Sequence, residues 1–305
     1  MEKTDLIWMD GELVPWDEAK VHVLTHALHY GTGVFEGIRC YSTDRGPAIF
    51  RLSDHIRRLL NSAKIHLMGT TVTVDEMVEA CKVVVRENAI DACYLRPLIW
   101  LGFGEIGLNP LNCEVHSMVA CWPWGAYLGD EGFTKGVRVK ISSYRRLDAN
   151  IIPPAAKATG QYLNSILAKV EALKAGYDEA VLLNIAGLVT DGSGENVFVV
   201  KDGVISTPPV SAGPLPGITR GSVMQIARDR DYEVREENLV RTDLYLADEV
   251  FFTGTAAELV PIREIDDRMV GTGTRGPITE ELQSVFFDVV HGRVAEYDHW
   301  LEYVK

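Results

Sequence analysis

Apolar and polar residues alternate along the chain in short blocks whose period changes several times, which is typical of a protein with both strands and helices. Near the start, two apolar runs flank Asp10-Gly11, a dipeptide that favours the tight turn of a β-hairpin. Ser53 has the side chain of a helix N-cap and precedes apolar residues at helical spacing. In the first half we therefore expect a hairpin at 7–14, helices at 53–64 and from 75, and strands at 94–100 and 115–121.

The second half is rich in short strand-like runs. Gly176 is typical of the residue that follows the last turn of a helix, and Lys201-Asp202-Gly203 is typical of a hairpin turn. Here we expect helices that end near 176 and begin near 218 and 279, with mostly antiparallel strands at 137–141, 179–184, 188–191, 196–201, 204–206 and 249–253. The fold class that follows is α+β.

A turn-rich segment separates the two halves. Residues 122–130 combine Trp, Pro and Gly directly after the last strand of the first half. Domain boundaries usually fall in such segments. We therefore predict a small N-terminal domain at 1–122, an interdomain loop at 123–135 and a larger C-terminal domain, built on antiparallel sheet, at 136–305.

Composition narrows the class of function. Of 305 residues 47% are apolar, and 30 Lys and Arg against 43 Asp and Glu leave a net charge of −13. This charge disfavours nucleic acid and anionic membranes as partners and favours an enzyme for small molecules. The five cysteines include no C-x-x-C pair, so they predict neither a disulfide framework nor a zinc site. No apolar run has the length of a signal peptide or a membrane span, so the cytoplasm is the default location.

The segment 22–39 contains three histidines and a G-x-G-x-x-x-G spacing. The glycine spacing differs from the dinucleotide-binding fingerprint. The histidines have no carboxylate or cysteine companions at a fixed spacing, as a metal site would require. We expect these histidines to pack or to form hydrogen bonds, and we expect no metal.

One lysine, Lys157, stands among small residues after two prolines. Ala156, Ala158 and Gly160 leave room for a bulky group beside its amine. Burial would lower the pKa of that amine, and an unprotonated amine can condense with an aldehyde. A lysine at the end of a solvated helix can have the same neighbours, so the interpretation as a reactive lysine depends on groups elsewhere in the chain.

Later segments supply such groups. Pro216-Gly217 leads straight into a helix, so the N–H groups of its first turn and the Thr219 hydroxyl could bind a phosphate, although a plain turn with a threonine cap has the same sequence. The small residues of 252–258 follow a strand, and their backbone could approach an anion closely. Asp191 and Glu195 flank a glycine-rich turn. This turn either lies in solvent or brings one carboxylate to a pyridine nitrogen, where it would keep the ring protonated and electron-withdrawing.

Over nearly its whole length the chain resembles the branched-chain amino acid aminotransferases, which are class IV aminotransferases and fold type IV pyridoxal-phosphate enzymes. The resemblance is carried by residues 29–31 with 34–39, 94–97, 124–129, 153–164, 194–196, 215–220 and 254–258. It implies the two-domain fold of these enzymes and pyridoxal 5'-phosphate as cofactor. It also implies a ping-pong reaction in which L-leucine, L-isoleucine or L-valine passes its amino group reversibly to 2-oxoglutarate, as in branched-chain amino acid biosynthesis.

The resemblance also assigns the catalytic and cofactor-binding residues. Lys157 would hold the cofactor and move the proton, Tyr162 would bind the ring hydroxyl, and Asp191 would face the ring nitrogen. The family commonly has a glutamate at the position of Asp191, so the shorter side chain calls for a backbone shift or a bridging water, with Glu195 as the reserve. The remaining cofactor-binding residues, most of them near the phosphate, would be Arg58, Leu215, Gly217, Ile218, Thr219, Gly254 and Thr255.

A substrate pocket is implied in the same way. Its residues would be Tyr30, Phe35, Gly37, Tyr94, Arg96, Trp124, Tyr127, Thr255 and Ala256. The Tyr94 hydroxyl and the N–H groups of Thr255 and Ala256 would hold the α-carboxylate. Phe35 and Trp124 would either line the pocket or belong to the core.

Arg96 has to serve two kinds of substrate. With the hydroxyls of Tyr30 and Tyr127 it could meet the distal carboxylate of glutamate. With leucine bound, the charge would have to stay hydrated or be paired at the rim, because an unpaired buried charge is strongly destabilising. In relatives a loop near Ile106 and Leu108 closes the pocket of a neighbouring subunit, so the resemblance implies a homo-oligomer, either a dimer or a dimer-based hexamer.

Other enzymes of the same fold type are the alternatives: D-amino acid aminotransferases, R-selective amine transaminases and aminodeoxychorismate lyases. The D-amino acid enzymes commonly have an arginine and a histidine two residues apart after the equivalent strand, whereas here Pro97 and Leu98 follow Arg96. A noncatalytic protein that only binds the cofactor or an amino acid is disfavoured, because it would need neither Lys157 nor an acidic partner for the ring.

Overall fold

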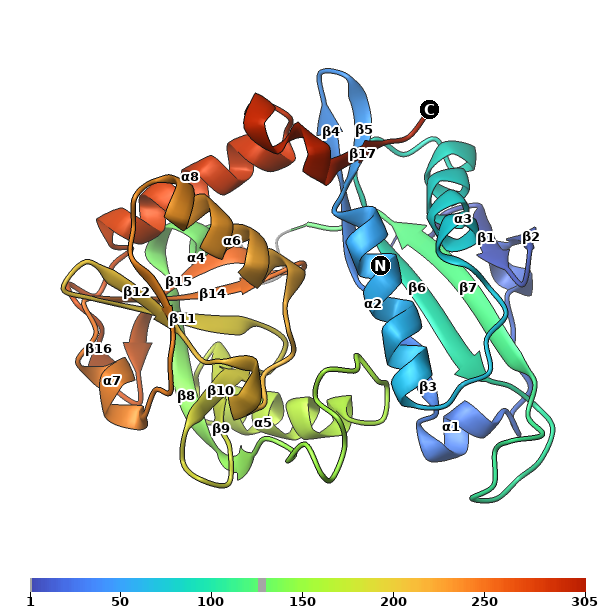
Figure 1. Cartoon of the computed structure of the whole chain (residues 1–305), viewed down its shortest axis with the longest axis horizontal. Helices are drawn as coiled ribbons and strands as arrows, with labels where there is room; N and C mark the ends of the chain where they lie inside the picture. The colour runs from blue at the N-terminus through green and yellow to red at the C-terminus, as the bar shows by residue number, and fades with distance from the viewer. Residues whose placement is uncertain (1, 126–129) are drawn as a thin grey trace. The chain divides into compact units, whose positions relative to one another are not determined.

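The computed structural model describes residues 2–125 and 130–305. The chain forms two compact units (Figure 1). Unit 1 comprises Met1–Trp124, Ala156–Gln161 and Val289–Lys305, and unit 2 comprises Gly125–Ala155 and Tyr162–Asp288. Among the described residues, no helix combines the length and the apolar character needed to cross a membrane.

Unit 1 is built on an antiparallel sheet of order β17-β5-β4-β6-β7-β1-β2, with β3 beside β6. The hairpin expected near the start is confirmed, with Asp10 and Gly11 at positive φ (48° and 103°), as the tight turn requires. The strands are β1 (Leu6–Met9), β2 (Glu12–Pro15), β3 (Gly33–Phe35), β4 (Ile38–Thr43), β5 (Gly46–Phe50), β6 (Cys93–Leu101), β7 (Val115–Trp122) and β17 (Leu301–Tyr303).

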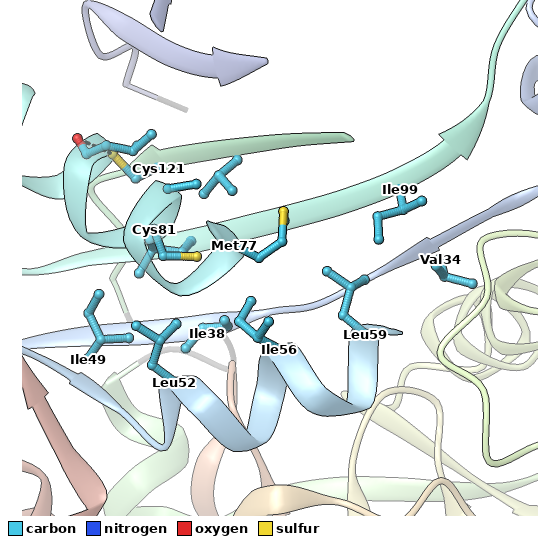
Figure 2. Close-up of a cluster of buried hydrophobic side chains, with 14 of the residues drawn as sticks. Val34, Ile38, Ile49, Leu52, Ile56, Leu59, Met77, Cys81, Ile99 and Cys121 are labelled. Atoms are coloured by element: carbon cyan, nitrogen blue, oxygen red, sulfur yellow. Dashed lines mark hydrogen bonds between the residues drawn. The ribbon is translucent and has the colours of Figure 1, made fainter. Parts of the chain in front are cut away.

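One face of this sheet packs on two helices, α2 (Leu52–Ile65) and α3 (Val74–Glu87). Figure 2 shows the core between them, where Ile38 and Ile99 of the sheet meet Ile56 and Met77 of the helices. Because successive side chains of a strand point to opposite faces, every second residue of β6 projects away from this core. Unit 1 also contains α1 (His26–Tyr30) and the 3-10 helices η1 (Trp16–Glu18) and η3 (Ala295–Trp300).

The prediction of Ser53 as the N-cap of α2 is wrong. The N-cap is Arg51, which adopts the left-handed conformation (φ 52°) and makes no side-chain capping bond. The backbone N–H of Ser53 instead donates to the carboxylate of Glu302 on β17 (2.7 Å). A residue far along the chain thus supplies the acceptor that a local cap would supply. The second helix begins one residue before the predicted start, after a capping box of Thr73 and Glu76.

Unit 2 is built on a mixed sheet of order β10-β9-β8-β15-β14-β11-β12-β13, with β16 beside β15. The expectation of mostly antiparallel strands holds for most pairs, but β8 runs parallel to β9 and β15, and β12 runs parallel to β13. The strands are β8 (Val137–Arg145), β9 (Glu179–Leu183), β10 (Val189–Gly192), β11 (Asn196–Lys201), β12 (Val204–Thr207), β13 (Val234–Glu236), β14 (Glu249–Gly254), β15 (Glu258–Ile265) and β16 (Arg268–Met269).

The helices expected in the second half are present with shifts of one or two residues at their starts or ends. α5 ends at Lys174, before Gly176 with φ 83°, and α6 begins at Ile218 as predicted. The helices of this half are α4 (Asp130–Lys135), α5 (Tyr162–Lys174), α6 (Ile218–Asp229), α7 (Arg241–Tyr245) and α8 (Pro277–Val290), with the 3-10 helix η2 (Val210–Ala212).

The two compact units do not contain the same residues as the predicted consecutive domains 1–122 and 136–305. Residues 156–161 belong to unit 1, where Ala158 forms a bridge with Val34. Residues 289–305 also belong to it, because β17 pairs with β5. In addition, α4 lies within the predicted interdomain loop 123–135. These associations depend on pairing between distant segments, for which a local pattern gives no signal.

Candidate functional site

Lys157 lies in unit 1 on a short segment beside β3. Its carbonyl accepts a hydrogen bond from the N–H of Phe35 (3.0 Å), and its own N–H donates to Oγ of Ser62 on α2 (3.0 Å). Two residues further on, the N–H of Thr159 donates to the carbonyl of Gly33 (2.8 Å). Lys157 is partly buried and precedes α5, which begins only at Tyr162. The backbone therefore fixes the base of this side chain, unlike that of a lysine at a solvated helix end.

The Lys157 amine lies over an aromatic ring. Its Nζ is 5.0 Å from the centre of the Phe35 ring, and Cζ of Arg96 is 4.7 Å from the same centre. A ring face carries negative potential and attracts cations at such distances. The structure thus brings together three of the predicted site residues, Lys157, Phe35 and Arg96.

A buried ion-pair cluster of Glu36, Arg58 and His55 lies close to Lys157. Glu36 is fully buried and accepts hydrogen bonds from Nε and Nη2 of Arg58 (2.6 and 2.8 Å) and from Nδ1 of His55 (2.8 Å). Burial alone would raise the pKa of Glu36, but Arg58 and His55 outweigh it and hold that pKa well below its usual range. Arg58, predicted to bind phosphate, therefore uses two of its N–H donors on Glu36.

Burial lowers the pKa of His55, against the attraction of Glu36, and the charges of Arg58 and Lys157 lower it further. The sequence analysis assigned no role to Glu36 or His55. The available signal was a carboxylate between Phe35 and Ile38, within an otherwise apolar run.

The raised pKa of Glu195 favours the folded state as the pH falls and acts on every variant alike, so the effect of His55 is defined against a His55→Gln variant. We expect the unfolding temperature of the wild type to fall relative to that of His55→Gln as the pH is lowered from about 7 to about 5, because of His55. Its pKa in the folded state lies below the ordinary 6.5, so the unfolded chain binds the proton more tightly. This contribution to stability is complete above 6.5 and is lost as the pH falls toward the folded pKa. Each kcal/mol lost lowers the midpoint by about 2–4 °C for a chain of this size.

Calorimetry of the wild type and of His55→Gln at both pH values tests this expectation. The variant keeps a hydrogen-bond donor for Glu36 but cannot be protonated in this range. As the pH is lowered, the midpoint of the wild type should fall relative to that of the variant. An equal change in both proteins would remove His55 as the cause.

The sheet face away from α2 and α3 carries further predicted residues. Tyr94 and Trp124 lie with ring centres 5.1 Å apart. Gly37 is next to them, since a Cβ built on it would lie 1.8 Å from the Tyr94 hydroxyl, so only glycine lets the hydroxyl lie there. Tyr30, at the end of α1, is 42% exposed and lies against His26. Tyr127 lies outside the described residues.

In unit 2, Asp191 is buried at the end of β10 and paired with Arg146. It accepts hydrogen bonds from Nε of Arg146 (2.8 Å) and from the hydroxyl of Thr190 (2.9 Å), with Nη2 of Arg146 at 2.6 Å. Arg146 is itself fixed by bonds to the carbonyl of Gly192 (2.7 Å) and the hydroxyl of Ser165 (3.1 Å). Burial raises the pKa of Asp191, and Arg146 acts against this rise. Arg146 belongs to no sequence motif, so the sequence does not indicate its role beside Asp191.

Glu195, the reserve for the same role, has a different environment. It is buried, and its carboxylate accepts the N–H of Gly194 (3.0 Å). Burial raises its pKa to about 8, helped by the charge of Glu179, while the nearby Lys169 pairs with Glu179 (2.5 Å). At neutral pH Glu195 is therefore mostly protonated. Asp191, which has a cation beside it, is the better source of a fixed negative charge.

The predicted phosphate-binding residues of unit 2 follow Gly217, the N-cap of α6. No side chain caps this helix, so the N–H groups of its first turn are not bound by a cap. A Cβ on Gly217 would lie 1.9 Å from Oδ1 of Asn196, whose amide donates to the carbonyl of Leu215 (2.9 Å). Glycine is therefore required there. Thr219, in the first turn, is buried.

A second set of donors lies where β14 ends. The Thr253 hydroxyl is buried and has no hydrogen-bond partner among the described residues. Gly254 and Thr255 follow it directly, at the turn into β15. N–H groups and hydroxyls suit a phosphate, and the carboxylate of Asp191 suits a protonated ring nitrogen. The N–H groups, hydroxyls and carboxylate of unit 2 therefore fit a phosphorylated pyridine cofactor.

The histidines of the segment 22–39 form hydrogen bonds, as expected. His26 contacts the Thr32 hydroxyl and the Gly107 carbonyl (both 2.8 Å), and His29 contacts the Val23 carbonyl (2.9 Å). Within the described part of the chain, no group of three or more His, Cys, Asp or Glu side chains could hold a metal ion.

Comparison with known families is decisive. The family model for amino-transferase class IV matches residues 33–265, and the branched-chain-amino-acid aminotransferase of Escherichia coli K12 is 47% identical over 305 residues, which cover 100% of this chain and 99% of that protein. The chain belongs to the class IV aminotransferases, in the branched-chain group. The resemblance and the fold type expected from the sequence are thereby confirmed, and so is the transamination of branched-chain amino acids.

Solved structures of class IV aminotransferases agree with this assignment. The Escherichia coli branched-chain enzyme superposes with a TM-score of 0.97 at 47% identity, over 99% of this chain and 100% of that one. The enzyme of Thermoproteus uzoniensis, solved with norvaline, gives 0.95 at 44% identity, over 99% and 100%. The enzyme of Thermobaculum terrenum, solved in its PLP form, gives 0.94 at 37% identity and covers both chains fully.

Proposed function

We propose that this chain transfers the amino group of L-leucine, L-isoleucine or L-valine reversibly to 2-oxoglutarate, with pyridoxal 5'-phosphate as its cofactor and ping-pong kinetics. The observation that carries the proposal is Lys157, with its fixed backbone and its amine over Phe35, in a chain 47% identical to a branched-chain enzyme over its full length. When bound, the cofactor supplies an electron-withdrawing ring that stabilises negative charge on the α-carbon of the substrate.

In this proposal Lys157 has two tasks. Its Nζ would hold the cofactor covalently in the absence of substrate, and once free it would accept the proton from the α-carbon of the substrate and donate it to the cofactor carbon that bears the amino nitrogen. Glu36 holds Arg58 in place through two bonds.

The residues of unit 2 hold and polarise the cofactor in the same proposal. Asp191, paired with the guanidinium of Arg146, would face the ring nitrogen, and Tyr162 would bind the ring hydroxyl. The phosphate is bound by Arg58 together with the loop residues Leu215, Gly217, Ile218, Thr219, Gly254 and Thr255. Each loop residue contributes an N–H or a hydroxyl, or is a glycine that lets the backbone approach.

The proposed substrate contacts fix the orientation of the amino acid. The Tyr94 hydroxyl and the N–H groups of Thr255 and Ala256 bind the α-carboxylate, which determines the bond that is broken. Arg96, with Tyr30 and Tyr127, meets the distal carboxylate of glutamate. Phe35, Gly37 and Trp124 line the space for an aliphatic side chain.

A second copy of the chain is the proposed partner. Helix α5 carries an exposed apolar stripe on one side, opposite the buried Ser165, Ala168 and Ala172. The stripe consists of Leu163, Ile166, Leu167, Val170 and Leu173, which are 40–63% exposed. Stripes of this kind normally pack against protein. A dimer, or a hexamer built from dimers, is proposed, and a monomer in sedimentation equilibrium would contradict it. A cytoplasmic location is also proposed, and fractionation of host cells tests it.

An assay with the purified, cofactor-loaded protein tests the function. L-Leucine and 2-oxoglutarate should give L-glutamate at a rate of about 1–1,000 per second, the common range for enzymes. D-Alanine is the matched control, because an enzyme of the D-amino acid type would accept it. Turnover of D-alanine without turnover of L-leucine would contradict the proposal.

A further inference from the structure

Arg96 projects from the side of the unit 1 sheet that faces away from α2 and α3. Its neighbour Leu95 is fully buried in the core beneath those helices, and alternate residues of a strand point to opposite faces. Directly opposite Arg96 on β7 is Ala120, whose small side chain leaves space beside the guanidinium. The same register places Tyr94 opposite Trp122. Arg96 and Trp122 are therefore diagonal neighbours on one face.

Three aromatic rings surround the charge of Arg96. Its Cζ lies 4.7 Å from the ring centre of Phe35, 5.5 Å from that of Tyr94 and 5.8 Å from that of Trp122. All three distances fall within the range of about 6 Å in which a ring face attracts a cation. We call Phe35, Tyr94 and Trp122 the aromatic cage. Trp122 belongs to none of the segments that carry the family resemblance.

Three buried nitrogens in and beside the aromatic cage are hydrogen-bond donors that have no acceptor among the described residues. Nε of Arg96 and the indole nitrogens of Trp122 and Trp124 are buried and have no hydrogen-bond partner among the described residues. A substrate with a distal carboxylate would supply an acceptor and a counter-charge. A substrate with an aliphatic side chain supplies neither, and it also removes water from the guanidinium.

The aromatic cage can offset the cost of leaving the Arg96 guanidinium without water or a counter-charge when an aliphatic substrate binds. Attraction between a cation and a ring is weak when water surrounds the cation, and it becomes several times stronger when water is excluded. The cage therefore stabilises Arg96 most when leucine has displaced the water. It contributes least when a carboxylate neutralises the charge.

We infer that the aromatic cage allows one pocket to take both leucine and glutamate, and that Trp122 is a specificity-determining residue for aliphatic substrates. This inference rests on the proposed function and extends it to Trp122, a residue that no sequence motif assigns to the site. The expectation was that the Arg96 charge stays hydrated or is paired at the rim, and the cage adds a third possibility, a charge held over ring faces inside the unit.

Calorimetric binding to the pyridoxal-phosphate-loaded protein tests the inference without turnover. The two probes are 4-methylpentanoic acid, which has the aliphatic side chain, and glutaric acid, which has the distal carboxylate. Trp122→Leu should bind 4-methylpentanoic acid about fivefold more weakly and glutaric acid with less than about a twofold change. Trp122→Phe keeps a ring and should recover most of the lost affinity.

Trp100→Leu is the matched control, because Trp100 lies on β6 and stacks on His116, outside the cage. It should leave the ratio of the two dissociation constants unchanged. Equal weakening of both acids by Trp122→Leu, no weakening, or no binding of either acid by the wild type would overturn the inference. A changed ratio in a protein that does not transaminate leucine would reject the proposed function and keep the inference.

Discussion

Lys157→Ala is expected to lower the rate of leucine transamination at least about 1,000-fold, because a positioned acid–base group contributes about 10²–10⁴ and the same amine also binds the cofactor covalently. The backbone of Lys157 forms hydrogen bonds with Phe35 and Ser62, and these bonds do not involve the lysine side chain. The fold of unit 1 should therefore remain, and the loss should be one of chemistry.

Steady-state rates with L-leucine, together with the unfolding temperature, check this result. Lys64→Ala is the control, since Lys64 is an exposed lysine on α2 of the same unit and should leave both quantities unchanged. If Lys157→Ala lowers the rate of leucine transamination only about 10-fold or less, Lys157 is not the proton carrier.

Asp191→Asn should lower the same rate at least about 100-fold, since it removes the charge that keeps the ring nitrogen protonated. It also leaves Arg146 buried without its counter-charge, and breaking a buried pair in this way costs about 3–5 kcal/mol of stability. Asp191→Glu restores the charge on the longer side chain that the family commonly has. Its rate should stay within about 10-fold of the wild type.

Glu195→Gln is the matched control for this prediction. Because burial and Glu179 raise the pKa of Glu195 to about 8, its carboxyl is already mostly neutral at pH 7, and an amide of the same size changes little. Rates and melting temperatures of the three variants distinguish the roles. A larger loss in Glu195→Gln than in Asp191→Asn would exchange the assignments of the two carboxylates.

Local signals predicted the elements whose cause is local. Asp10-Gly11 specifies its hairpin because the turn needs two residues at positive φ, and Gly176, whose φ is 83°, marks a helix end for the same reason. The N-cap of α2 could not be predicted, because the N–H of Ser53 in its first turn is bound by the distant Glu302. β15 was missed as well: it contains Pro261, and a proline argues against a strand with neighbours on both sides.

The candidate site divides in the same way. Lys157, Thr219 and Asp191 stand in distinctive local patterns and could be named from the sequence. Arg146 and Trp122 could not, because their importance comes from what lies across a strand pair or a helix, and the register that places them is a property of the folded sheet. Charged or aromatic residues with ordinary neighbours in sequence carry no signal until that register is known.

The contribution of β17 to unit 1 has a consequence for synthesis. As the polypeptide leaves the ribosome, the edge beside β5 stays open and Ser53 lacks its acceptor until residues 301–303 emerge. Unit 1 thus reaches its complete form only after all of unit 2 has been translated. A message truncated shortly before codon 301 would yield a product whose earliest-made sheet is the incomplete part.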